Sequence, residues 1–361
     1  LSCNPSIGGL SKANLAREID ALGGEMALIT DQTSIQYRLL NRSRGPAVQA
    51  ARVQSDKSAY SILARKALEA QPGLHIFMDT VDGLLCSQTV PPRVLGVSTV
   101  RGNKISAKKV IIASGTFMDG RIFIGEYHAW EGRLGEPTAL GLGSWLRKAG
   151  FPVGRMKTGT PARIKASSVD LDSLEKQAGD PDRMPFSFLN EELPGPDIPC
   201  HITFTNERTH EIIRANIGRS PLFSGEITGK GPRYCPSIED KVVKFPHRDK
   251  HQIFVEPEGQ YTDELYLNGM SSSLPEEVQR EFVKTLPGFE EAFMVRPGYA
   301  VEYDYVDPID LHPSLESRRM TSLYLAGQTN GSSGYEEAAA QGLMAGINAV
   351  LSMRGEEPII L

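Results

Sequence analysis

The chain has 361 residues, of which 40% are hydrophobic and 23% charged, as in an ordinary globular protein with room for two domains. Its formal net charge of −5 excludes a global basic field for nucleic acid, so any RNA contact must come from a local patch. No apolar run approaches the roughly 20 residues that span a bilayer, and we expect no membrane contact. No signal peptide is visible, which carries little weight in a chain that opens on Leu1.

The cysteines and histidines predict no metal or disulfide chemistry. The four cysteines stand at positions 3, 86, 200 and 235, and no two have the CxxC spacing of a metal or redox pair. Four cysteines are too few for a disulfide scaffold, so we expect reduced thiols inside a cell. The seven histidines show no HExxH or related spacing. We therefore predict no metal site.

The first third of the chain predicts a loop over residues 1–9 and then two helices. Ser11 is the expected N-cap of the first helix, which Gly23 and Gly24 end. The second helix is expected over residues 56–69, where Tyr60, Leu63, Ala67 and Leu68 share one face.

Short strands are expected at residues 74–77, 94–97 and 110–113. The last strand runs into Ser114, Gly115 and Thr116. A strand that stops at small residues is typical of a nucleotide-binding sheet, whose ligands lie beyond the carboxyl ends of the strands.

The middle of the chain, from about residue 153 to 295, is rich in proline and glycine and has weak helical periodicity. Short strands are expected there at 251–255 and 264–267. We interpret this segment as a sheet-rich domain inserted into a nucleotide-binding domain formed by 1–152 and 296–361. A final strand (322–326), loop (327–334) and helix (335–351) complete the outer domain.

The loop Gly327–Gly334 carries the strongest motif. Its glycines, Gly327, Gly331 and Gly334, allow a backbone to approach a ligand closely, and the following helix presents free N–H groups and a positive dipole end. The alternative is an ordinary glycine loop between strand and helix. The Gly-Lys-Ser/Thr ending of a Walker loop is absent.

Two cysteines lie in settings that suit catalysis. Cys3 stands at the mouth of the loop Cys3–Gly9, although a buried, inert cysteine is the more common case. Cys235 lies between prolines near Arg233 and Lys241, and nearby cations favour the reactive thiolate. The alternative there is a rigid turn with an inert thiol. Cys86 and Cys200 have no such setting, and we interpret both as structural.

Local clusters of cations suit a phosphate backbone or a pyrophosphate. Residues 38–66 hold seven Lys or Arg against one acid, and a solvated helix face is the alternative. Arg155 and Lys157 stand among glycines and fit either an anion grip or a turn between domains. The candidate phosphate contacts are Arg38, Arg42, Arg44, Arg52, Arg155 and Lys157.

Several longer segments of the sequence resemble one family. The segments SCNPSIGG, NRSRGPAV, GRMKTGTPARI, GPRYCPSIEDKVVKF, QIFVEPEG, RPGYAVEYDY and AGQTNGSSGYEEAAAQG are similar to GidA/MnmG proteins, in that family's order and spacing, over essentially the whole chain. The family's GxGxxG loop and C-terminal helical region have no counterpart here. The resemblance implies an α/β fold: an FAD-binding Rossmann-like domain of the glutathione-reductase type, incomplete at its N-terminus, with an inserted β-rich NAD/substrate domain.

The resemblance also implies an activity. Family members use FAD, NADH and methylenetetrahydrofolate, with an MnmE-type GTPase partner, to place an aminomethyl or carboxymethylaminomethyl group on C5 of the wobble uridine (U34) of tRNA. A homodimer is expected, in the cytoplasm of a bacterium or the mitochondrion of a eukaryote. A thiolate that adds to C6 of uracil activates C5, so we expect Cys3, Cys235 or both to take part near the flavin, with Cys235 favoured as the nucleophile.

The cofactor contacts follow by matching blocks. For FAD they are Asn4, Gly8, Gly9, Val81, Gly115, Thr116, Gly327, Gln328, Gly331, Gly334 and Tyr335. For NAD they are Gly231, Arg233, Tyr234, Glu239 and Lys241.

Three rival functions stay open at this point. The first is the related folate- and FAD-dependent uracil-5 methyltransferase of the tRNA T-loop. The second is a truncated FAD- or RNA-binding fragment without catalysis, which the missing glycine fingerprint favours. The third is a generic NADH–flavin oxidoreductase, and the absence of CxxC argues against its disulfide-reducing form.

Overall fold

A computed structural model describes residues 3–229, 231 and 236–361, and these residues form two compact units. Unit 1 comprises 1–72, 123–128 and 158–300, and unit 2 comprises 73–122, 129–157 and 301–361. This division by contacts groups the first 72 residues with the middle of the chain. The sequence-based division into an FAD-binding domain, 1–152 with 296–361, and an inserted domain, 153–295, stays a prediction.

Unit 1 begins with a small antiparallel sheet in the order β1-β3-β2. Residues 1–9 were expected to be a loop, but Ser6, Ile7 and Gly8 pair with Gln54, Val53 and Arg52 of the third strand. The elements of this part are β1 (Ser6–Gly8), α1 (Ala13–Ala21), α2 (Met26–Gln32), β2 (Ser34–Leu40), β3 (Ala50–Ser55) and α3 (Lys57–Ala70).

The two expected N-terminal helices form with different caps. Helix α1 begins without a side-chain cap, because Ser11 has a positive φ of 59° and Lys12 occupies the N-cap position. The Ser11 cap was therefore wrong. Asp56 does cap α3, its Oδ1 accepting a 2.8 Å hydrogen bond from the Ala59 N–H.

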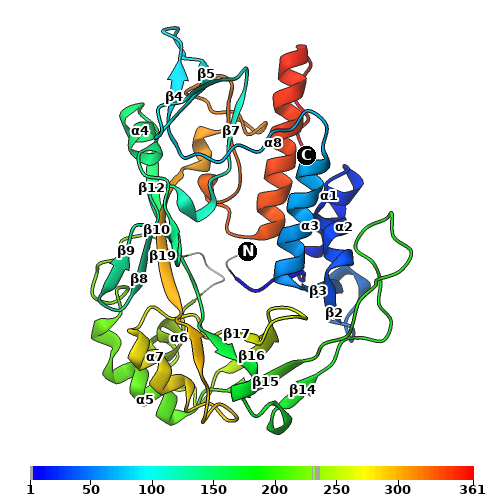
Figure 1. The fold of residues 1–361 in the computed structure, drawn as a ribbon, viewed down its shortest axis with the longest axis vertical. Helices are drawn as coiled ribbons and strands as arrows, with labels where there is room; N and C mark the ends of the chain where they lie inside the picture. Colours follow the sequence, from blue (N-terminus) through cyan, green and yellow to red (C-terminus); the bar gives the residue numbers. More distant parts are fainter. Residues whose placement is uncertain (1–2, 230, 232–235) are drawn as a thin grey trace. The chain divides into compact units, whose positions relative to one another are not determined.

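The remainder of unit 1 is a six-stranded antiparallel sheet in the order β14-β15-β16-β17-β13-β18, with helices α5, α6 and α7 beside it (Figure 1). Ile213, Val242 and Phe282, one from each helix, are buried in the same apolar core as Ile253 and Leu267 of the sheet. The elements are β13 (Arg163–Lys165), β14 (Glu175–Gln177), β15 (Cys200–Phe204), α5 (Glu207–Ala215), α6 (Ile238–Lys244), β16 (Gln252–Pro257), β17 (Glu264–Asn268), α7 (Glu276–Val283) and β18 (Met294–Arg296).

Unit 2 contains one parallel pair of strands and a three-stranded antiparallel sheet in the order β4-β5-β6. Leu84, Leu146 and Leu325 belong to its largest apolar core. The elements are β4 (Val81–Cys86), β5 (Val94–Thr99), β6 (Lys104–Ser106), β7 (Val110–Ile112), β10 (Glu131–Arg133), β11 (Glu136–Pro137), α4 (Leu142–Lys148), β20 (Leu323–Leu325) and α8 (Tyr335–Arg354), with short 3₁₀ helices at Gly115–Phe117 and Gly327–Asn330.

Three strands carry the chain from one unit into the other: β8 (Arg121–Ile124), β12 (Val153–Thr160) and β19 (Tyr299–Val306). With β9 (Tyr127–Ala129) they form a sheet in the order β12-β19-β8-β9.

One expected strand does not form. Residues 74–77 lie in an extended segment without strand pairing, and Leu74, Ile76 and Phe77 are exposed. A strand needs partners for its backbone N–H and C=O groups, and no described strand pairs with this segment. The other expected strands are confirmed to within a few residues.

Candidate functional site

The expected nucleotide-binding edge is present in unit 2. Strand β20 pairs in parallel with β7, Leu323 to Leu325 lying opposite Val110 to Ile112. Because parallel strands end at the same edge, the loops that follow them meet. Ser114 N–H donates to the Thr329 hydroxyl (3.1 Å), and the two hydroxyl groups lie 3.0 Å apart.

Gly115 and Gln328, both predicted FAD contacts, lie together at this edge. Gly115 has a φ of 61°, and a Cβ placed on it would lie 3.5 Å from Oε1 of Gln328. The Gln328 amide donates to the Tyr303 hydroxyl (3.4 Å). Gly327 has a φ of 72°, and its N–H donates to Oε1 of Gln341 in α8 (2.8 Å). Both glycines have a left-handed (αL) backbone conformation, which residues with a Cβ rarely adopt.

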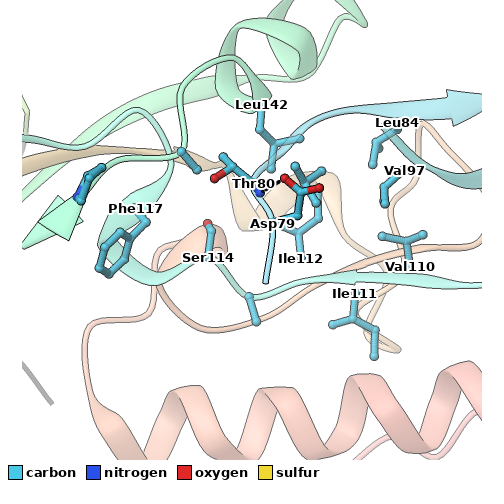
Figure 2. Close-up of a pocket in the computed structure, with 14 residues that line it drawn as sticks. Asp79, Thr80, Leu84, Val97, Val110, Ile111, Ile112, Ser114, Phe117 and Leu142 are labelled. Carbon is cyan, nitrogen blue, oxygen red and sulfur yellow. Dashed lines mark hydrogen bonds between the residues drawn. The ribbon is translucent and has the colours of Figure 1, made fainter. Parts of the chain in front are cut away.

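A cavity of about 410 Å³ lies at this edge of unit 2, where Leu84, Val97 and Val110 gather to one side of the polar Asp79 and Thr80 (Figure 2). An apolar cavity of this size with a few polar groups is typical of a small-molecule site, and it suits part of a dinucleotide. Its lining comprises Asp79, Thr80, Val81, Leu84, Val97, Val110, Ile111, Ile112, Ala113, Ser114, Phe117, Pro137, Ala139 and Leu142.

Asp79 supplies the cavity's ionised group. Partial burial acts to raise its pKa, but hydrogen bonds from Thr99, Asn103 and the Thr80 N–H lower the pKa of Asp79 to about 2. Oδ1 accepts from the Thr80 N–H (2.8 Å) and pairs with Arg101 (3.1 Å), while Oδ2 accepts from Thr99 and Asn103 (2.8 Å each). Both oxygens are therefore engaged within the protein.

Sequence reasoning named Val81 for this cavity but missed Asp79, Thr80 and Ser114. Asp79 and Thr80 directly precede β4, and no motif marks them. Ser114 belongs to the run of small residues after β7 that the sequence analysis noted.

The other predicted FAD residues of unit 2 lie around the same loops. The Thr116 hydroxyl is buried and donates to the Gly132 carbonyl (2.6 Å), so its hydrogen is already bonded within the protein. Gly331, with a φ of 89°, ends the 3₁₀ turn, Gly334 is the N-cap of α8, and Tyr335 is its first residue. These three residues shape the entry to α8.

The Cys3–Gly9 segment lies in unit 1. The Cys3 thiol lies 3.8 Å from the carbonyl oxygen of Gly159, a weak hydrogen bond. The Asn4 amide donates to Oε2 of Glu256 (2.8 Å). Glu256 is fully buried, and this burial raises its pKa against the opposing field of the Arg52 guanidinium.

The close approach predicted at Gly8 is made to the protein itself. Gly8 has a φ of 89°, and a Cβ there would lie 2.3 Å from the Ala51 carbonyl oxygen and 2.5 Å from the Phe186 ring. Gly9, with a φ of 97°, donates to the same carbonyl (2.7 Å). Both glycines are thus required by the β1–β3 pairing, whatever ligand lies nearby.

Of the predicted NAD contacts, Arg233 and Tyr234 lie outside the described residues, as does the candidate nucleophile Cys235. Gly231 is exposed. Glu239 is buried and accepts hydrogen bonds from the Ser273 N–H (2.8 Å) and the Ser272 hydroxyl (3.0 Å). Its carboxylate therefore anchors a neighbouring loop.

Lys241 lines a second cavity, of about 280 Å³, in unit 1. Its ammonium donates to the Gly269 carbonyl (2.7 Å), and burial lowers its pKa. The lining residues are Pro236, Lys241, Phe245, Arg248, His251 and Gln252. Two cations and an aromatic ring suit a phosphate-bearing ligand.

The predicted phosphate contacts differ in how their side chains are placed. Arg42 pairs with Asp182 (2.8 Å) and Asp180 (3.7 Å). Arg155 pairs with Glu302 (3.0 Å) and Asp304 (2.9 Å), and Lys157 is buried. These pairings reduce the charge available for an RNA backbone.

Arg38 and Arg52 lie directly opposite each other on β2 and β3, both half-buried, and Arg44 is exposed. Burial raises the pKa of Cys200 to about 12, although the nearby guanidiniums of Arg52 and Arg38 act to lower it. Burial also raises the pKa of Cys86. At neutral pH both thiols stay protonated, as expected for structural cysteines.

Among the described residues, no cluster of three or more potential metal ligands occurs. Within the same residues, no helix is long and apolar enough to cross a membrane.

The fold and the unit 2 cavity define a mixed α/β protein with a nucleotide-binding type of sheet edge. Over residues 1–357 the chain matches the family model described as glucose inhibited division protein A, and it belongs to that family. It is 58% identical over its whole length to the tRNA uridine 5-carboxymethylaminomethyl modification enzyme MnmG of Borrelia garinii subsp. bavariensis, and 57% identical over 98% of its length to that of Treponema denticola. The sequence-based family assignment is confirmed.

Two solved structures of Aquifex aeolicus GidA share the fold. The form I crystal structure has a TM-score of 0.94 at 48% identity and the form II structure 0.92 at 46%, each over 100% of this chain. The predicted α/β class, of the Rossmann-like FAD-binding type, is thereby confirmed. The chain covers 58% of the Borrelia relative, 57% of the Treponema relative, and 61% and 58% of the two solved chains.

Proposed function

We infer that the chain is part of a flavoprotein that modifies C5 of the wobble uridine (U34) of tRNA to an aminomethyl or carboxymethylaminomethyl derivative. The relatives that carry this activity in their names are 57–58% identical to the chain, and this identity is the observation on which the proposal rests. NADH, methylenetetrahydrofolate and an MnmE-type GTPase complete the proposed reaction, and a homodimer in the bacterial cytoplasm or the mitochondrion is the proposed setting.

The unit 2 cavity fits part of FAD. Backbone groups of Thr80 and Val81, the Ser114 hydroxyl and the glycine-bearing loop at Gly115 all border or adjoin an apolar space of about 410 Å³. When bound, FAD would supply the redox chemistry, while these residues hold and orient it.

Cys3 and Cys235 are the proposed thiols of the uridine chemistry. A thiolate would form a bond to C6, and the C5=C6 electron pair would form the new bond from C5 to the one-carbon unit of methylenetetrahydrofolate, whose bond to a folate nitrogen breaks. Loss of the C5 proton and cleavage of the S–C6 bond would then restore the C5=C6 double bond and release the thiolate. The Cys3 thiol is half-buried, in a loop that the Asn4–Glu256 hydrogen bond ties to β16. The basic cavity around Lys241 is the proposed site for phosphate groups of NADH.

Nucleoside mass spectrometry of tRNA tests the proposal. Cells that lack the full-length gene are expected to lose the C5 modification at U34, and wild type restores it. Cys235→Ser or Cys3→Ser is expected to fail, while Cys86→Ser, which changes a thiol with a raised pKa, serves as the matched control and restores it. Intact wobble uridines with loss of the T-loop methyl group would replace this proposal with the methyltransferase.

A further inference from the structure

Two buried aspartates meet in unit 2 beside the wall of its cavity. Asp119 follows the 3₁₀ turn Gly115–Phe117, and Asp304 lies in β19 with no exposed surface. The Asp304 N–H donates to the Met118 carbonyl (2.8 Å), which fixes the two segments against each other.

The outer oxygens of both carboxyl groups point at one helix residue. A Cβ built on Gly143, in the first turn of α4, would lie 2.1 Å from Oδ2 of Asp304 and 2.3 Å from Oδ2 of Asp119. Neither oxygen has a donor among the described residues. Two buried acceptors that face each other without a donor are costly, unless one of them carries a proton.

The other oxygens are satisfied by cations and amides. Oδ1 of Asp304 accepts from Arg147 (2.6 Å) and Arg155 (2.9 Å). Oδ1 of Asp119 accepts from the Gly141 N–H (3.1 Å), and the Asp119 carbonyl accepts from Arg155 (2.7 Å). A proton therefore has one place to lie, between the two Oδ2 atoms.

The charges around the pair agree with one shared proton. Asp304 pairs with Arg147 and Arg155, and Glu302 pairs with Arg155. Asp119 and Asp304 thus place two buried carboxyl groups side by side, and each makes ionisation of the other less favourable. Burial, and then the neighbouring Asp304, raise the pKa of Asp119, although the Gly141 N–H and Arg147 oppose the shift. Asp82 of β4 faces the backbone of Gly141 and accepts from Ser98 (2.7 Å).

The pair is continuous with the cavity wall. The Asp119 N–H donates to the Ala139 carbonyl (3.2 Å), and the Ala139 N–H donates to the Phe117 carbonyl (2.8 Å). Phe117, Ala139 and Leu142 all line the cavity. Fixing Asp119 against Asp304 and α4 thus fixes three lining residues.

We propose that Asp119 and Asp304 share one proton between their Oδ2 atoms and that this hydrogen bond positions the Phe117–Leu142 wall of the unit 2 cavity. The pair is a positioning element, independent of which ligand the cavity takes. Deprotonation would place two adjacent carboxylates behind the wall and push its two segments apart.

Asp119→Asn tests the shared proton, because an asparagine amide can donate to Asp304 at any pH. The folded state binds a proton here that the unfolded state releases above about pH 4. The wild type is therefore expected to lose stability relative to Asp119→Asn as the pH rises above that value, by up to about tenfold in the unfolding equilibrium per pH unit. Asp304→Asn, which also weakens the bonds from two arginines, is expected to be less stable throughout.

Chemical denaturation of the 361-residue chain between pH 4 and pH 8 provides the measurement, with infrared detection of a protonated carboxyl group at neutral pH. Support requires both the pH-dependent gap and a carboxylic-acid band that Asp119→Asn removes. A gap between wild type and Asp119→Asn that stays constant with pH, or the absence of that band in the wild type, would overturn the proposal. If Asp304→Asn does not fold, the Asp119→Asn comparison still decides.

Discussion

The side-chain amide of Asn4 donates a 2.8 Å hydrogen bond to Oε2 of Glu256, a carboxyl group 252 residues further along the chain that is fully buried. Asn268 donates to the other oxygen (3.2 Å). Asn4 follows Cys3 directly, so one buried carboxyl group anchors the loop that carries a candidate catalytic thiol. This contact joins two segments, SCNPSIGG and QIFVEPEG, that the sequence analysis treated separately.

Removing the Glu256 carboxyl group is expected to loosen the Cys3 loop. Glu256→Ala leaves a cavity and two unpaired amides, at an expected cost of about 3 kcal/mol in unfolding free energy. Glu256→Gln retains the shape, and an asparagine amide can rotate to accept from it, so the expected cost is about 1 kcal/mol. Denaturant unfolding measures both values, and alkylation of Cys3, followed by peptide mass spectrometry, is expected to accelerate only in Glu256→Ala. Equal alkylation rates in the two variants would show that Glu256 does not anchor the loop.

Gly143→Ala is expected to destabilise unit 2. The new Cβ would lie within 2.3 Å of carboxylate oxygens of Asp119 and Asp304. Because both carboxyl groups are buried, this overlap can be relieved only by moving α4. We expect a loss of about 2–4 kcal/mol in unfolding free energy.

Gly342→Ala is the matched control for that substitution. Gly342 lies within α8, and a Cβ there meets no heavy atom within 4 Å. Its expected effect is a gain of about 0.5–1 kcal/mol, from the higher helix propensity of alanine. Similar losses of unfolding free energy in the two variants would mean that the close contacts at Gly143 do not cause the destabilisation.

Stability is expected to fall in mildly acidic solution because of His251. Burial, followed by the neighbouring His210, Lys241 and Arg248, lowers the pKa of His251 from 6.5 to about 4. The folded state therefore resists a proton that the unfolded chain takes up. This contribution is fully present above pH 6.5 and is lost as the pH falls towards 4, by on the order of 1 kcal/mol after allowance for solvent screening.

Unfolding between pH 7 and pH 4.5 provides the measurement for His251. His251→Gln is expected to flatten the acid limb of the stability profile, while His75→Gln, at an exposed position of the 73–80 segment, leaves it unchanged. An acid limb of the same slope in wild type and His251→Gln would assign the titration to another group.

The sequence predicted the elements that depend on local patterns. Asp56 and the periodicity after it specify α3, and the apolar run ending at Ser114 specifies β7. Residues 74–77 have strand-like composition but no described partner strand, so composition alone misled. Ser6–Gly8 were missed for the opposite reason, because their strand exists only through pairing with β3, more than forty residues away.

The candidate site likewise contains residues that local patterns predicted and residues that depend on distant partners. Gly115, Gly327 and Gln328 were predicted from loops after strands, and the parallel pairing of β7 with β20 brings them together. Asp79 and Asp119 carry no motif, because their environment depends on burial and on partners distant in sequence. Arg155 fitted a phosphate contact by its neighbours, but Asp304 and Glu302 engage its charge in the structure. Long-range electrostatic partners of this kind cannot be read from local sequence.

Flavin binding by the 361-residue chain tests most directly whether unit 2 carries an FAD site. Ala113 lines the cavity and is exposed, so Ala113→Trp fills the space without disturbing a buried contact. Ala70→Trp, at the exposed end of α3, is the matched control. In a titration followed by flavin fluorescence, wild type and Ala70→Trp are expected to bind FAD with the same affinity, and Ala113→Trp at least about tenfold more weakly, a loss of about 1.4 kcal/mol or more. Equal binding by all three proteins, or no binding by the wild type, would contradict an FAD site in this cavity.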